Sequence, residues 1–103
     1  MNRFDIYKDL QQIAVQHGDP TPHVMLTEWG FSTIDSPVGF DPAVQAEYVA
    51  VGFNLMLADP TVDGIVYVNL YNPGTDFWGR TALTDTGFGL LQGYNVYRQF
   101  ATL

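Results

Sequence analysis

The sequence has no cysteine and few basic residues, and each of these features excludes some classes of function. Without cysteine the chain forms no disulfide, has no thiolate nucleophile and offers no cysteine ligand to a metal, while the cellular compartment stays open. Four lysine and arginine residues against eleven carboxylates give a formal net charge of −7. A chain of that sign is repelled by nucleic acid and by anionic membranes, so we expect neither as a partner.

Long apolar runs and common cofactor motifs are also missing. No stretch approaches the roughly 18–20 apolar residues that span a bilayer, and residues 1–12 lack the apolar segment of a signal peptide. Glycine-rich phosphate loops, Gly-x-Ser-x-Gly elbows and His-x-x-x-His pairs do not occur. We therefore expect no nucleotide, no metal and no other cofactor. With 103 residues, 47% of them apolar, the chain is one globular domain at most.

Hydrophobic spacing predicts five elements in the order helix, strand, helix, strand, helix. Helices are expected over about 3–17, 42–58 and 90–102, and strands over 23–28 and 65–71. Gly18 stands where a left-handed cap ends the first helix, and Asp41 with Pro42 predicts the start of the second. Both strands are short and mostly apolar without clean alternation, which is typical of parallel strands buried on both faces.

Two strands joined through a helix must be parallel, with a right-handed crossover. Two parallel strands cannot close a sheet, and both edges stay bare. Three helices would not cover both faces of such a sheet either. The pattern therefore predicts either a piece of a larger α/β fold or a chain that completes its sheet with other copies.

Two long loops that follow the strands are the expected site of chemistry. They run over about 12 and 17 residues, against the usual ~2–6, and they combine aromatic rings, amides and carboxylates. Such a mixture suits a sugar, whose ring face stacks on aromatics while its hydroxyls bond polar groups. Glu28 ends the first strand, where a carboxylate can attack an anomeric carbon. An acid that caps a loop amide or simply meets water explains its position equally well.

The residues around Glu28 resemble a known family. The string His-Val-Met-Leu-Thr-Glu-Trp-Gly-Phe-Ser-Thr at 23–33 looks like the seventh strand of the large clan of retaining (β/α)8 glycoside hydrolases, where a Thr-Glu-aromatic-Gly string ends the strand. Residues 64–71, then Asp-Phe-Trp-Gly-Arg at 76–80 and Leu-Thr-Asp-Thr-Gly at 83–87, are similar to its eighth strand, the following loop and the turn before the last helix. The resemblance implies that residues 1–103 are the C-terminal fragment of an α/β TIM barrel, from helix six to helix eight.

The resemblance also implies roles for individual residues. Glu28 would be the catalytic nucleophile of an O-glycosyl hydrolase acting on a polysaccharide or oligosaccharide. The substrate-binding residues would be Trp29, Tyr71, Asn72 and Trp78. The clan takes its acid/base from an Asn-Glu pair on the fourth strand, and this sequence has no such pair. Glu47, the other glutamate, lies inside the second predicted helix, so we expect the acid/base to lie outside these residues.

Two further hypotheses and several side chains stay open. The chain is alternatively a non-catalytic carbohydrate-binding unit, or an architectural piece whose copies form a homo-oligomer through open sheet edges.

Other side chains are expected to have structural roles. Asp76 and Arg80 are expected to pair within their loop, and Asp35 is expected to stabilise a turn. His23 is interpreted as structural, and His17 as a helix-terminal residue stabilised by the helix dipole.

Overall fold

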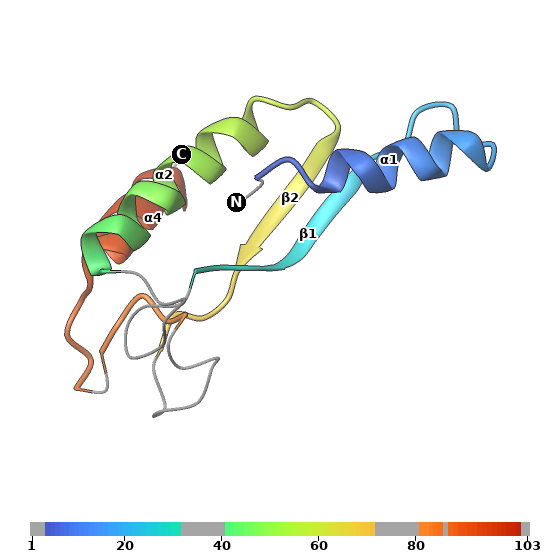
Figure 1. The fold of residues 1–103 in the computed structure, drawn as a ribbon. Helices are drawn as coiled ribbons and strands as arrows, with labels where there is room; N and C mark the ends of the chain where they lie inside the picture. Colours follow the sequence, from blue (N-terminus) through green and yellow to red (C-terminus); the bar gives the residue numbers. More distant parts are fainter. Residues whose placement is uncertain (1–3, 32–40, 72–80, 86, 102–103) are drawn as a thin grey trace.

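The computed structural model describes residues 4–31, 41–71, 81–85 and 87–101 (Figure 1). Its elements are α1 (Tyr7–Gln16), β1 (Val24–Trp29), α2 (Pro42–Leu57), β2 (Val62–Tyr67) and α4 (Gln92–Ala101). β1 and β2 pair in parallel and form a two-stranded sheet. The predicted order of elements and the parallel pairing are thus confirmed, and the fold is mixed α/β.

Local signals place the end of α1 and the start of α2 as predicted, whereas α1 begins at Tyr7 instead of about residue 3. The Asp41 side chain accepts a hydrogen bond from the Ala43 backbone N–H at 2.8 Å, and Pro42 is the first residue of α2. Gly18 follows α1 with a φ of 102°, a backbone conformation that glycine adopts without the steric cost a side chain would bring.

Non-local pairing moves two other boundaries. β2 covers 62–67 instead of the predicted 65–71, because its register follows β1 from Val24 opposite Val62 to Trp29 opposite Tyr67. α4 begins at residue 92 instead of 90. Leu90 pairs with Thr84 in an isolated antiparallel bridge, which keeps this part of the chain extended.

The hydrophobic core lies between one face of the sheet and the helices α2 and α4, which lie side by side (Figure 1). Phe53 of α2 occupies its middle. The Phe53 ring stacks on Phe100 of α4 at 5.2 Å between centroids and meets the edge of Trp29 of β1 at 5.1 Å. Val49 and Tyr67 complete the buried cluster on the helix and on β2. Rings from both strands therefore fix which face of the sheet is covered.

The opposite face of the sheet is open. Met25 and Val66 lie on it and are 61% and 49% exposed, although both are apolar. The accessible surface of the chain is 6601 Å², whereas a folded monomer of this mass has about 5,800 Å². The radius of gyration of 14.9 Å also exceeds the ~13 Å of a compact domain of this length. The chain thus exposes more surface than a self-contained domain does.

α1 lies at the amino ends of the strands and is joined to the turn before β2 by polar bonds (Figure 1). The Tyr7 hydroxyl donates to the Asp59 carboxylate at 2.8 Å, and Gln11 Nε2 donates to Thr61 Oγ1 at 2.7 Å. Hydrogen bonds from the Thr61 side chain and backbone to Asp59 lower the pKa of that carboxyl to about 2. Burial and the bond to Asp59 raise the pKa of Tyr7 to about 12.

The contact between Trp29 and α2 leads to a prediction. A Cβ atom at Gly52 would overlap the Trp29 ring, so we expect Gly52→Ala to lower the free energy of unfolding by about 1–3 kcal/mol through overpacking. In an unobstructed helix interior the same change is stabilising by about 0.5–1 kcal/mol. Urea unfolding followed by circular dichroism measures the difference. Asn54→Ala, an exposed position of α2, is the control and should change stability by less than about 0.5 kcal/mol. A stabilised Gly52→Ala variant would contradict the packing.

Candidate functional site

Glu28 is the penultimate residue of β1, at the carboxyl end of the sheet, and its side chain is exposed. The register shifts between Leu26 and Trp29, so β1 carries one more residue there than β2 does. This β-bulge contains Thr27 and Glu28, and both are exposed. Bulges occur next to active sites and at barrel rims because they redirect a side chain without ending the strand. The bulge presents Glu28 at the end of the open face.

Trp29 points the other way, into the core. Its indole meets Phe31, Phe53 and Tyr67 edge to face, with ring centroids 5.0, 5.1 and 5.9 Å apart. Trp29 is half-buried against the core cluster, whereas Thr27 and Glu28, the two residues of the bulge, are both exposed. Trp29 was expected as a substrate-binding residue beside Glu28; the ring contacts described here are all with core side chains, and a contact with substrate stays a prediction. The Trp29 ring packs against the core, whereas the Glu28 carboxylate is exposed.

The Glu28 carboxylate is not engaged by its surroundings. Within 4–31, 41–71, 81–85 and 87–101, no side chain or backbone amide forms a hydrogen bond or ion pair with it. The interpretation of Glu28 as an amide cap therefore finds no partner in the part of the chain that the structure describes. Among the described residues, nothing occupies the hydrogen-bonding capacity of this exposed carboxylate.

An aromatic pair lies at the same end of the sheet, beyond β2. Tyr71 and Phe88 stack with centroids 4.5 Å apart and planes 12° from parallel, and they are 41% and 70% exposed. The Asp85 carboxylate holds the turn beneath Phe88, because its Oδ1 accepts hydrogen bonds from the Gly87 and Gly89 N–H groups at 2.9 and 2.7 Å. Tyr71 was predicted as a binding residue. Phe88 was missed, although the string Asp-Thr-Gly-Phe-Gly at 85–89 is a turn signal that would present a ring.

The remaining candidates divide into those the structure places and those it does not. His23 lies just before β1, at the far end from Glu28, with its Nδ1 atom 2.9 Å from Asp63 Oδ1, which agrees with a structural role. His17 is the C-cap of α1, as expected for a helix-terminal residue. Five residues lie outside the described part of the chain: Asp35, Asn72, Asp76, Trp78 and Arg80.

A polar cluster beneath the carboxyl end of the sheet was not foreseen. The Tyr67 hydroxyl, at the end of β2, accepts a hydrogen bond from the Phe31 backbone N–H at 3.4 Å and donates one to the Thr81 carbonyl at 3.0 Å. It thereby bridges the residues that follow β1 and β2. Burial raises the pKa of Tyr67 to about 12, against the opposing effect of hydrogen bonds from Phe31 and Gln45.

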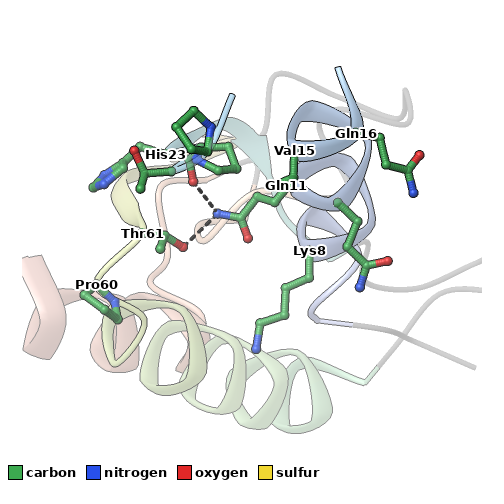
Figure 2. Close-up of a pocket in the computed structure, with 11 residues that line it drawn as sticks. Lys8, Gln11, Val15, Gln16, His23, Pro60 and Thr61 are labelled. Carbon is green, nitrogen blue, oxygen red and sulfur yellow. Dashed lines mark hydrogen bonds between the residues drawn. The ribbon is translucent and has the colours of Figure 1, made fainter. Parts of the chain in front are cut away.

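A groove lies at the opposite end of the sheet. It encloses about 960 Å³ between α1 and the segments that precede the two strands, and Glu28 does not line it. Figure 2 shows the Gln11 side chain crossing from α1 to Thr61 and to the Pro22 carbonyl, the latter at 3.0 Å. This polar bridge occupies the middle of the groove. The groove is thus the space beneath a loosely packed helix and is separate from the carboxylate.

Other chemistry finds little support in the described residues. Among them, no three histidine or carboxylate side chains gather as metal ligands, and no helix has the length and apolarity to cross a membrane. Comparison with family models, with curated proteins and with solved structures finds no match to this chain. Its function must be inferred from its own residues.

The buried Tyr67 hydroxyl leads to a prediction at alkaline pH. In the unfolded chain Tyr67 ionises near its ordinary pKa of 10, but in the folded chain only near 12. Its protonated form therefore contributes stability that is complete below pH 10 and is lost as pH rises to 12, by up to about 2–3 kcal/mol. Urea unfolding at several pH values should show this loss, and Tyr67→Phe should show less of it. Equal losses in both proteins would contradict the assignment, because Tyr7 and all other titrating groups are common to both.

Proposed function

We propose that the chain carries the nucleophile of a retaining glycoside hydrolase and that Glu28 is this nucleophile. The observation that supports it is the position of Glu28, exposed in a bulge at the carboxyl end of a parallel strand. In parallel α/β folds this end of the strands carries the catalytic groups. The resemblance of residues 23–33 to the nucleophile strand of the clan leads to the same residue.

On this proposal β1 and β2 are the seventh and eighth strands of a (β/α)8 barrel. Helices cover the outside of such a barrel, and branched or apolar side chains fill its interior in layers. The face covered by α2 then corresponds to the outside, and the open face with Met25 and Val66 to the interior. Met25 and Val66, which this chain exposes to water, would be buried inside a complete barrel.

The proposed chemistry needs a second carboxyl group. The Glu28 carboxylate attacks the anomeric carbon, a glycosyl ester forms as the bond to the leaving group breaks, and water then hydrolyses the ester. A second carboxyl about 5–5.5 Å away protonates the leaving group and activates the water. Glu47 lies on α2, which covers the face opposite to Glu28. The acid/base would be supplied by chain outside these 103 residues.

The proposed ligand is a carbohydrate, bound without a cofactor. The stacked Tyr71 and Phe88 rings offer a flat apolar face to the CH groups of a sugar. Asn72 and Trp78, which follow β2, are proposed as further substrate-binding residues, as the resemblance implies. On this proposal Trp29 acts indirectly, because its ring packs β1 against α2.

Covalent labelling tests the nucleophile without the missing acid/base. A sugar fluorinated beside its anomeric carbon, with a dinitrophenolate leaving group, needs no proton to react and leaves a slowly hydrolysed ester on the nucleophile. We expect a panel of such sugars of gluco, galacto, manno and xylo configuration to include one that labels Glu28. Peptide mass spectrometry locates the label.

Glu28→Gln should reduce this labelling to background, because an amide is a poor nucleophile. Glu47→Gln removes the other glutamate from an exposed position and should label as the unmodified chain does. A label on any other residue, or one that persists in Glu28→Gln, overturns the proposal.

A second candidate role is self-association, which the exposed apolar surface favours. The excess of accessible surface over a compact monomer is about 800 Å², close to what each partner loses in a standard interface. Both strands of the sheet are edge strands, and the open face carries Met25 and Val66. A second copy packed on this face would cover these side chains.

Light scattering coupled to gel filtration checks this role. We expect a dimer or larger oligomer at micromolar concentration, and Val66→Lys should shift the population toward monomer by about tenfold or more in dissociation constant, since it places a charge in an apolar contact. Asn95→Lys adds the same charge at an exposed position of α4 and should have no effect. A concentration-independent monomer excludes self-association.

A further inference from the structure

A fully buried glutamine stands at the first turn of α2. Gln45 has no exposed surface, and its backbone N–H donates to the Asp41 carbonyl at 2.9 Å. Glutamine is mostly found on protein surfaces, and burying an amide is unfavourable unless hydrogen bonds replace those to water. The contacts of this side chain therefore indicate what it is for.

Gln45 joins three segments that are distant in sequence. Its Nε2 atom lies 2.9 Å from the Phe31 carbonyl, which follows β1, and 3.3 Å from the Tyr67 hydroxyl at the end of β2. It also lies 3.3 Å from the carbonyl oxygens of Thr81 and Ala82. Two N–H bonds are thus shared among four acceptors, and both segments that leave the sheet at its carboxyl end are tied to one helix.

The oxygen of the Gln45 side-chain amide also bears on the role of this residue. Gln45 Oε1 is buried and has no hydrogen-bond partner among the described residues. It lies against Gly93 of α4, where any side chain would crowd it. An apolar side chain of similar size would leave no orphaned oxygen here, but it would remove the donor that Gln45 gives to the Phe31, Thr81 and Ala82 carbonyl groups. The bonding of this amide is thus one-sided: its donor serves the carbonyl groups of the two segments.

The backbone between Glu28 and Phe31, whose carbonyl Gln45 bonds, is short and held by hydrogen bonds. Phe31 lies three residues after Glu28, and the Trp29 carbonyl between them accepts the Val68 N–H at 2.9 Å. A shift of the Phe31 carbonyl would therefore move the end of β1, where the bulge presents Glu28.

We propose that Gln45 is a positioning residue, which holds the backbone after Glu28 at a fixed place relative to the segment after β2. The inference rests on the proposed function for its catalytic meaning. The structural part, the coupling of the two segments, stands apart from it. Gln45 touches no reacting atom; it acts through Phe31 and Tyr67.

The test compares three variants of the full chain. Gln45→Met keeps the volume and removes the donor. Gln45→Glu restores one O–H donor when its carboxyl is protonated. Val49→Ala, one turn further along α2, is the control, because Val49 is equally buried in the core but bonds none of the carbonyl groups.

The first readout is amide hydrogen exchange, which needs no substrate. The reporters are the N–H groups of Val68 and Leu83, bonded to the Trp29 and Asn69 carbonyl groups at 2.9 and 3.0 Å. We expect Gln45→Met to speed their exchange about tenfold relative to amides in the middle of α2. Val49→Ala should leave this ratio unchanged. An unchanged ratio in Gln45→Met overturns the coupling, whatever the chain does with sugars.

The second readout is the rate at which the activated fluoro-sugar labels Glu28, divided by the folded fraction. We expect about a tenfold decrease in Gln45→Met and none in Val49→Ala. For Gln45→Glu, the ratio of its labelling rate to that of the unmodified chain should be near one at low pH. The ratio should fall as the new carboxyl ionises beside the carbonyl groups. Tyr67, the titratable side chain in contact with residue 45, stays protonated throughout.

The outcomes separate the two proposals. If the unmodified chain is labelled elsewhere than at Glu28, the proposed function fails, and hydrogen exchange alone decides the role of Gln45. If Glu28 is labelled but Gln45→Met reacts at the rate of the unmodified chain, the positioning role is overturned. A pH-independent ratio in Gln45→Glu overturns it as well, because the donor would then have no effect.

Discussion

The packing of the Trp29 ring against α2 is the contact on which the rest of the structure depends. It determines which face of the sheet is core, while the bulge just before Trp29 leaves Thr27 and Glu28 exposed. Gly52 makes the contact close, because the helix backbone can approach the indole where no side chain intervenes. A single ring thus sets the orientation of β1.

The carboxyl end of the sheet is built in two layers around this contact. Toward the helices, Tyr67 and Gln45 bond the segments that follow the strands. Toward solvent, the bulge exposes Glu28, and the stacked Tyr71 and Phe88 rings lie beyond β2. Buried hydrogen bonds thus hold the backbone on the side of the helices, and exposed side chains lie on the side of the solvent.

The sequence was sufficient for features that depend on neighbouring residues. The order of elements, the Asp41 cap and the Gly18 terminus follow from local propensity and spacing, and all are confirmed. The end of β2 and the start of α4 were misplaced, because a strand ends where its partner ends and Leu90 is drawn into a bridge with Thr84.

At the candidate site too, the sequence located a residue from its neighbours in the chain but did not reveal contacts between distant segments. Glu28 was located by position and resemblance, and its exposure agrees with that interpretation. The side of the sheet that Trp29 faces was not readable, because a bulge changes the alternation and no residue announces it. Gln45 was overlooked for a related reason. A glutamine on a helix is normally a surface residue, and only the arrival of three distant segments makes this one the centre of a buried network.

The attachment of α1 has a consequence for how the molecule comes apart. None of its residues belongs to the buried cluster of Val49, Phe53, Tyr67 and Leu83, and its Ile6, Leu10 and Ile13 neighbours face water. Detachment of this helix would expose the buried Tyr7 ring and pull on Phe4, which packs edge to face on Phe31 and Tyr48. Opening at α1 therefore disturbs one edge of the aromatic cluster, whereas separation of β1 from α2 disrupts the core itself.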